Sequence, residues 1–200
     1  WDAVIIPQSF FNMLPDDPAR VRDFIEKQIS ELAAASAEVQ AQGDGKNSPR
    51  VKNIAKRMRA LGEKLDKLSN RRQDDTVYFE ALGVDALFVD EAHEYKKLFF
   101  QTIMDSIKGV DVNSPSERAF SLYLKSRFIR DKIGAERNVI LATGTPVSNT
   151  IAEAWTMMRF IREDLLERFG VKTFDAFASS FGDFKVDTEQ RPGGDFKSVT

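Results

Sequence analysis

The sequence contains no cysteine and only one histidine, His93. Without cysteine the chain has no disulfide framework and no thiolate nucleophile, which suits a reducing cytosol. A single histidine with no cysteine cannot build a His- and Cys-rich zinc site. These absences exclude disulfide-stabilised, thiol-dependent and zinc-finger-like classes of protein. Any metal site would have to use oxygen ligands.

Long apolar runs and an excess of one charge are also missing. No run of about 18 apolar residues occurs, so the sequence predicts no contact with a membrane through a spanning helix. Lys and Arg number 29 against 31 Asp and Glu, so only a local basic patch could bind nucleic acid. The hydrophobic share, 42% of 200 residues, suffices for one domain, or for one domain with an insertion. The chain opens on Trp1 without Met or a signal-peptide pattern, and we expect it to be part of a longer protein.

Two long stretches have apolar residues at helical spacing. The first face consists of Ile25, Ile29, Leu32, Ala35 and Val39, and the second of Val51, Ile54, Met58, Leu61, Leu65 and Leu68. The polar segment QGDGKNSP, with two Gly and a Pro, separates them. The pattern predicts an antiparallel helical hairpin over residues 16–75, packed along these two faces and projecting from the rest of the fold.

The remaining sequence alternates short apolar runs with amphipathic segments. Strands are predicted at residues 3–6, 86–89 and 139–142, and helices at residues 116–133, 149–162 and 173–184. Strands separated by helical segments favour an α/β fold with a parallel sheet covered on both faces. The segment around Pro192-Gly193-Gly194 is typical of a β-hairpin.

Each predicted strand is followed by polar residues that could form a site. In open α/β sheets ligands bind at the carboxyl ends of the strands, so these residues should converge on one edge. The run Ala86–Val89 leads directly into Asp90 and Glu91. An Asp there can hold a magnesium ion, and the next Glu can take a proton from an attacking water, as in phosphoryl transfer from a nucleotide. The alternative is that the strand has simply reached water and the acids form surface salt bridges.

Two motifs carry a resemblance to a known family. LFVDEAH, followed about fifty residues later by VILATGTPVSNT, resembles motifs II and III of superfamily two helicases. The segment LATGTPVSNTIAEAWTMMRFI is similar to the Swi/Snf-type branch. FEALGVDALFVDEAHEYKKL and TFDAFASSFGDF resemble the large helicase–methylase proteins of phages and mobile elements. The resemblance covers most of residues 1–15 and 76–184.

The resemblance implies roles for individual residues. Asp90 would hold magnesium through water, Glu91 would activate the attacking water, and His93 would link the nucleotide site to the third motif. The coupling residues that it implies are Thr143, Gly144 and Thr145. Gln8 and Ser9 would touch a nucleic-acid backbone, although Pro7-Gln8-Ser9 departs from the threonine-rich form usual there. For the third motif, a plain strand-ending turn is the alternative.

The resemblance also implies an incomplete motor. No Gly-x-x-x-x-Gly-Lys-Ser/Thr occurs in the sequence, so nothing predicted here cradles phosphates. We expect a partial RecA-like P-loop NTPase lobe formed by residues 1–15 and 76–184, with 16–75 inserted and 185–200 as a hairpin or tail. The family resemblance implies the strand order 3–6, 86–89, 139–142. Its partners would be the phosphate-loop segment, a second RecA-like lobe and nucleic acid, with double-stranded DNA the expected form. ATP and Mg²⁺ would serve the cytoplasmic, bacterial or phage-encoded parent; the chain alone should be inactive and bind neither.

The predicted hairpin leaves a second function open. Residues 50–75 carry nine Lys or Arg against four acids, a net charge of +5, whereas residues 16–40 have a net charge of −3. The two arms could pair their charges with each other, or the basic arm, with Arg57 and Arg59, could lie along a DNA backbone. The chain could accordingly be a non-catalytic DNA- or protein-binding module on a degenerate motor lobe. We also expect the isolated chain to protect the strand at 139–142 by self-association, by covering it with residues 185–200, or to aggregate.

Overall fold

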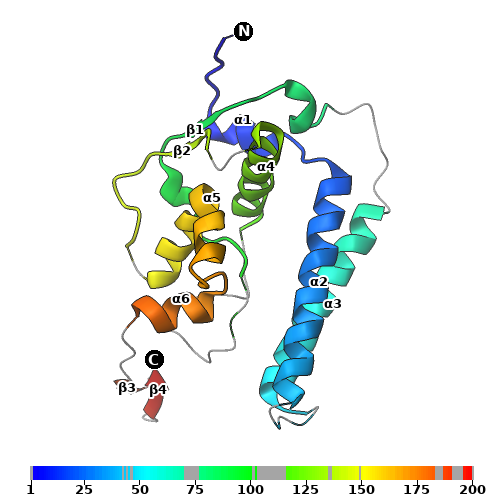
Figure 1. Cartoon of the computed structure of the whole chain (residues 1–200), viewed down its shortest axis with the longest axis vertical. Coiled ribbons are helices and arrows are strands. Elements are labelled where there is room, and N and C mark those ends of the chain that lie inside the picture. Colours follow the sequence, from blue (N-terminus) through cyan, green and yellow to red (C-terminus); the bar gives the residue numbers. More distant parts are fainter. Residues whose placement is uncertain are drawn as a thin grey trace. The chain divides into compact units, whose positions relative to one another are not determined.

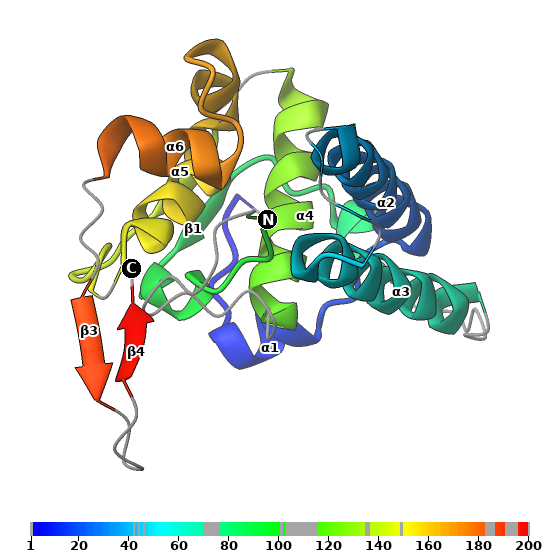
Figure 2. The same cartoon turned by 90° about the horizontal axis from the view of Figure 1, so that it is seen from below.

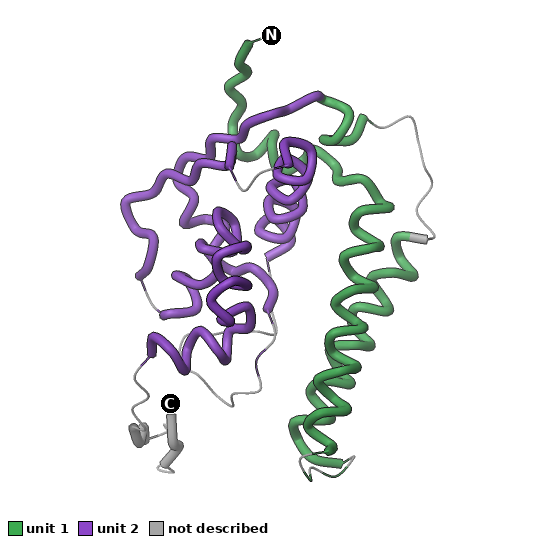
Figure 3. Tube along the Cα trace, viewed as in Figure 1, with its two compact units in different colours: residues 1–82 green, residues 83–200 purple. Residues whose placement is uncertain are grey.

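The computed structural model describes residues 2–41, 43, 45, 47–69, 77–100, 102, 116–134, 137–148, 150–182, 187–190 and 196–199, with backbone alone for Ser69 and the last two ranges. The chain divides into two compact units, residues 1–82 and 83–200 (Figure 3). The grouping of residues 1–15 with 76–184 into one lobe stays a prediction. Among the described residues, no helix combines the length and the apolar character that crossing a membrane requires.

Unit 1 is dominated by two long helices that begin in the same way. Helix α2 spans Pro18–Ala41 and helix α3 spans Pro49–Ser69. Asp17 precedes the first helix and accepts a hydrogen bond from Ala19 N through Oδ1 at 2.8 Å. Ser48 precedes the second and accepts one from Val51 N through Oγ at 3.2 Å. An oxygen-bearing cap followed by proline at the first helical position satisfies the orphan amides and presets the backbone, which fixes both starting points.

The two helices pack against each other along their apolar faces. They lie side by side in both views of the chain (Figures 1 and 2). Their shared core consists of Leu32, Val39, Val51 and Ile54, with Met58 and Leu61 packed against it. Ile25 is also buried, while Ile29 and Leu65 are half-buried. The helical hairpin predicted from the apolar spacing is therefore formed, with its seam displaced slightly toward the connecting turn.

The two ends of the hairpin meet. Phe79 N donates to Pro15 O at 3.1 Å, and Asp17 N donates to Glu80 Oε2 at 3.2 Å. These contacts join the start of α2 to the short 3₁₀ helix η1, Phe79–Leu82. The ring of Phe79 meets that of Phe11, in helix α1 (Gln8–Met13), edge-on at 6.1 Å. A segment that leaves and returns at one place can be added to a fold without disturbing it.

The predicted strand at residues 3–6 is wrong. Residues 2–7 form no helix or strand, and the side chains of Val4 and Ile5 are 70% and 98% exposed. A strand is defined by hydrogen bonds to a neighbour as well as by apolar residues, and in the part of the chain that the structure describes this segment joins no sheet. The three-strand order expected from the sequence therefore fails at its first member.

Unit 2 contains the other two predicted strands, and they pair. Strand β1 (Leu87–Val89) runs parallel to β2 (Val139–Leu141), with Leu87 opposite Val139, Phe88 opposite Ile140 and Val89 opposite Leu141. Among the described residues this sheet has only these two strands. Its two faces differ, because Val89 is buried whereas Phe88 is 75% and Ile140 43% exposed.

Three helices follow the strands of unit 2. Helix α4 spans Glu117–Ile133, α5 spans Ile151–Arg168 and α6 spans Phe174–Phe181. Capping hydroxyls start the first and the last: Ser116 accepts from Ala119 N and Thr173 from Ala176 N, both at 3.3 Å. Helix α5 runs six residues beyond its predicted end, with a kink at Arg162, where φ is −148° and ψ is 58°.

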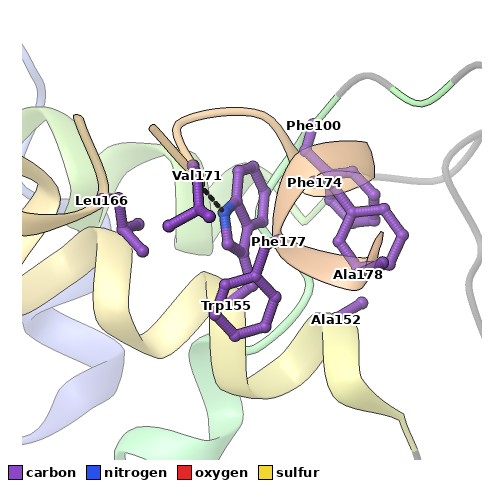
Figure 4. Close-up of a cluster of buried hydrophobic side chains, with 8 residues drawn as sticks. All are labelled: Phe100, Ala152, Trp155, Leu166, Val171, Phe174, Phe177 and Ala178. Atoms are coloured by element: carbon purple, nitrogen blue, oxygen red, sulfur yellow. Dashed lines mark hydrogen bonds between the residues drawn. The ribbon is translucent and has the colours of Figure 1, made fainter. Parts of the chain in front are cut away.

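Aromatic side chains form the core between α5 and α6 (Figure 4). Trp155 donates from Nε1 to the carbonyl of Val171 at 3.3 Å, so its polar edge is satisfied while the rings pack. The ring of Phe100 lies 5.3 Å from that of Trp155 and 4.7 Å from that of Phe174. Through Phe100, this cluster packs the segment that follows β1 against helices α5 and α6, which follow β2.

The carboxyl-terminal segment forms its own small sheet. Strands β3 (Asp187–Gln190) and β4 (Phe196–Val199) pair antiparallel, which confirms the predicted β-hairpin; its turn lies outside the described residues. In the described part of the chain this hairpin does not join β1 and β2. Covering of the strand at 139–142 by residues 185–200 was one of three expected ways to protect that strand, and the described hairpin does not provide it by strand pairing. Self-association and aggregation stay predictions.

Candidate functional site

The carboxyl ends of β1 and β2 bring two polar turns together. Beyond the strands, Ala142 N donates to Val89 O at 2.8 Å and Ala92 N donates to Ala142 O at 2.9 Å. These two bonds extend the parallel pairing into the acidic turn, Asp90–His93, and the threonine turn, Thr143–Thr145. The two turns are thus held side by side by backbone hydrogen bonds.

The acidic turn has an unusual backbone. Glu91 has φ of 50° and ψ of 43°, the left-handed region that side chains rarely adopt. Its amide donates to Oδ1 of Asp90 at 2.9 Å, and its side chain is 64% exposed. A strained residue at a strand end, held by its neighbours, is a pattern found at functional sites. The turn points a carboxylate to solvent at the edge of the sheet.

His93 joins the acidic turn to the threonine turn. Its Nδ1 lies 3.2 Å from Thr143 Oγ1 and 3.1 Å from Glu91 Oε2. Thr143 Oγ1 also accepts a hydrogen bond from Thr145 N at 3.1 Å, which fixes the hydroxyl over its own turn. The other ring nitrogen, Nε2, lies 3.5 Å from Glu94 Oε1. The imidazole therefore contacts both turns, and the coupling role suggested for His93 stays a prediction.

A second connection between the two strand ends was not predicted. Lys96, three residues after His93, places Nζ 3.0 Å from Ser148 Oγ and 3.2 Å from Glu153 Oε2. Ser148 N also donates to Glu153 Oε2, at 2.6 Å. The side chains of Lys96 and Glu153 are only 8% and 15% exposed, so this is a largely buried ion pair. It ties the segment after the acidic turn to the loop after the threonine turn and to the first turn of α5.

A buried charged cluster lies between α4 and α5. Tyr123 donates to both oxygens of Glu163, at 2.9 and 2.7 Å, and Arg127 pairs with the same carboxylate. The Arg159 guanidinium stacks 4.9 Å from the Tyr123 ring and donates to Phe99 O at 2.9 Å. Burial raises the pKa of Tyr123 to about 12. Burial also works to raise the pKa of Glu163, but Arg159, Tyr123 and Arg127 together hold it below the ordinary value. No sequence pattern pointed to this cluster.

The other predicted site residues are placed as follows. Gly144 and Thr145 are exposed within the threonine turn. Gln8 and Ser9 lie in the first turn of α1, in unit 1, and their expected convergence on the sheet edge stays a prediction. On α3, Arg59 is exposed while Arg57 is half-buried.

The carboxylates of the acidic turn fit one kind of metal. In the described residues, no group of three or more His, Asp or Glu side chains could hold an ion by itself. Mg²⁺ is bound in many nucleotide sites by one or two carboxylates together with substrate phosphates and water. Asp90, with a carboxylate at an exposed strand end, suits that arrangement and does not suit a closed protein cage.

Comparison with known proteins identifies the family. Residues 1–192 match the family model described as "Probable helicase domain". The chain is also similar to the "Defense against restriction protein B" of Escherichia phage P1, with 24% identity over 197 residues. That match covers 98% of this chain, and the chain spans about 8% of the length of the phage protein. No solved structure matches. Since the family model covers nearly all of the sequence, the chain belongs to the probable helicase domain family.

Proposed function

We propose that the chain is part of the first RecA-like lobe of an ATP-dependent nucleic-acid helicase or translocase. The motor would be of the Swi/Snf type and would belong to a large phage or mobile-element protein with an attached methylase, acting in the bacterial cytoplasm. Family membership supports a helicase-related chain. The further roles rest on the geometry of the two strand ends.

The contact between His93 and Thr143 is the observation that carries the proposal. In a motor of this kind, hydrolysis of the nucleotide must change the contacts between the protein and the nucleic acid. The acidic turn would sense the nucleotide, and the threonine turn, with Gly144 and Thr145, would pass the change to the nucleic acid. The imidazole of His93 touches both Glu91 and Thr143, so it can carry that signal through two contacts.

Glu91 is the proposed general base. Its carboxylate stands at the end of β1 and would accept a proton from the water that attacks the terminal phosphate. Asp90 would bind Mg²⁺ through water, and the ion would neutralise charge on the phosphates. The hydrogen bond from the Glu91 amide orients the Asp90 carboxylate, and His93 Nδ1 contacts the Glu91 carboxylate at 3.1 Å.

The open face of the small sheet supports the idea of an incomplete lobe. Parallel sheets are normally covered on both faces. Phe88 and Ile140 lie opposite each other on one face and are 75% and 43% exposed. In the parent, the phosphate-loop segment and its helix would cover this face, and a second lobe would complete the nucleotide site. Gln8 and Ser9 would contact the nucleic-acid backbone.

A contrast between three variants of the full-length protein tests the proposal. Glu91→Gln should abolish ATP hydrolysis and leave nucleotide binding within a few fold, because it removes the base and keeps the magnesium ligand. Asp90→Asn should weaken binding of magnesium–ATP as well. Glu167→Gln removes an exposed carboxylate paired with Lys172 and should change neither. Hydrolysis by Glu91→Gln at the rate of the unsubstituted protein would overturn the proposal. The 200-residue chain alone should show no turnover.

A further inference from the structure

Helix α3 presents a row of basic side chains opposite its packed face. Lys52, Lys56, Arg59 and Lys67 are all exposed, and we call them the basic stripe. At about 100° per residue they fall within an arc of roughly 80°, centred opposite the seam formed by Val51, Ile54, Met58 and Leu61. The stripe thus faces away from α2.

The basic stripe makes no ion pair with the described acids of its own hairpin. Arg57, by contrast, is half-buried on the flank and has an interaction partner within the described chain. The pairing of opposite charges between the arms therefore does not account for the stripe. Glu63 is the one acid that lies within the arc of these four cations, so the row keeps a net charge of +3 and favours an external polyanion.

The face of α2 that points to solvent has a different composition. Its exposed residues in the second half of the helix include Ala33, Ala34 and Ala37, with Glu38 beside them. Helix α3 therefore offers a row of cations, whereas the second half of α2 offers a surface with little charge and the first half carries charges of both signs. This separation favours a partner that lies along α3 alone.

The chemistry of α3 selects among polyanions. Its sequence contains no Phe, Tyr or Trp, so it lacks the stacking platforms that bind single-stranded bases. Its apolar face is used in the seam with α2 and is not open to a lipid surface. From Lys52 to Lys67 the stripe extends roughly 22 Å along the helix, a length over which one strand of a DNA duplex presents several phosphates.

We propose that the basic stripe of α3 binds the phosphate backbone of double-stranded DNA without regard to sequence. The choice of DNA as the polyanion rests on the proposed function. The existence and position of the stripe are structural observations and do not depend on it. The stripe revises the sequence-based assignment, because it keeps Arg59, replaces Arg57 and adds the three lysines.

The test measures binding of a fluorescein-labelled 30-base-pair duplex by the 200-residue chain, using fluorescence anisotropy from 50 to 200 mM salt. Neutralising three members, Lys52→Gln, Lys56→Gln and Arg59→Gln, should weaken binding at least ~10-fold at 50 mM salt and reduce the salt slope by about 2 to 3. The matched control, Arg22→Gln, Lys27→Gln and Lys172→Gln, removes the same charge elsewhere and should leave the slope unchanged within error.

A gain-of-charge variant tests the same surface without removing a side chain contact. Glu63 is the one acid within the arc of the stripe, and it is exposed. Glu63→Lys should tighten duplex binding and raise the salt slope by about 1, whereas Glu26→Lys, on the exposed face of α2, should not. Circular dichroism checks that each variant keeps its helices.

The outcomes separate this inference from the proposed function. If the triple variant of the stripe and the triple control variant have equal salt slopes of duplex binding, the stripe does not bind DNA. That conclusion would hold whatever effect Glu91→Gln has on ATP hydrolysis. A stripe that binds duplex in a protein whose ATP hydrolysis survives Glu91→Gln would uphold the stripe and reject the motor site. Tighter binding of single-stranded than of double-stranded DNA would also overturn the proposal.

Discussion

His93 Nδ1 lies 3.2 Å from Thr143 Oγ1, although fifty positions separate the two residues in the sequence. This contact crosses from the turn after β1 to the turn after β2. It exists because the parallel pairing of the strands continues through Ala92 and Ala142. The predictions below follow from the structure around this contact.

The first prediction concerns the strength of the contact. A double-mutant cycle of His93→Ala and Thr143→Val in the 200-residue chain should give an interaction free energy of about 1 kcal/mol in urea unfolding. Thr150 precedes α5 and makes no side-chain cap hydrogen bond. A cycle of His93→Ala with Thr150→Val should be additive within about 0.5 kcal/mol. A coupling of similar size in both cycles would contradict a direct bond.

The second prediction concerns the strained residue of the acidic turn. Glu91→Gly should be about 1 kcal/mol more stable than Glu91→Ala, because only glycine relieves the left-handed backbone. At an ordinary helical position the order is reversed, and Glu167→Gly should be about 1 kcal/mol less stable than Glu167→Ala. Thermal or urea unfolding of the four variants provides the comparison. If Glu91→Ala has a higher free energy of unfolding than Glu91→Gly, the backbone at position 91 is not strained.

A third prediction addresses the buried ion pair of Lys96 and Glu153. Lys96→Met should destabilise unit 2 by about 3 kcal/mol, since it leaves the Glu153 carboxylate largely buried without its cation. The exposed pair of Lys172 and Glu167 is the control, because Lys172→Met should cost less than about 1 kcal/mol. Urea unfolding measures both. If Lys96→Met and Lys172→Met lower the free energy of unfolding equally, burial does not strengthen the pair of Lys96 and Glu153.

The predictable part of the fold is the part encoded by local pattern. The apolar spacing along α2 and α3, with Asp17-Pro18 and Ser48-Pro49 at their starts, is enough to place the helical hairpin. The predicted end of α5 at Arg162 coincides with the kink, where the backbone leaves the helical region, and the pattern did not predict the helical stretch that follows to Arg168. Local apolar spacing does not show which neighbouring strand a segment would hydrogen-bond to. For that reason the exposed apolar run around Ile5 was wrongly predicted to be a strand.

The site was predictable only where a motif marks it. Asp90 and Glu91 stand out because they follow an apolar strand, whereas the family resemblance singled out His93 and the threonine turn; the roles of all of them stay predictions. Lys96 and Glu153 carry no such mark, since a lone lysine and a lone glutamate are usually solvated and these two meet across 57 positions. Tyr123 and Glu163 likewise meet only once two helices have packed.

The fourth prediction concerns stability at high pH. The pKa of Tyr123, raised by burial to about 12, lies above its ordinary value of 10.0. The neutral phenol therefore contributes stability that is fully present below pH 10 and is lost as the pH rises through about 12, amounting to about 3 kcal/mol. Tyr123→Phe should flatten this alkaline loss in urea unfolding measured from pH 8 to 12. Parallel stability curves for the unsubstituted chain and Tyr123→Phe would contradict the assignment.

The decisive measurement is the ratio of nucleic-acid-stimulated to basal ATP hydrolysis in the full-length protein, compared between Thr143→Ser and Thr143→Val. Serine keeps the hydroxyl that meets His93, and valine keeps the shape without it. If the two turns act as one unit, the valine variant should lose most of the stimulation, at least ~10-fold, and retain basal hydrolysis, while the serine variant behaves as the unsubstituted protein. Equal stimulation of both variants would show that the contact carries no signal, and the two turns would then have to be regarded as independent.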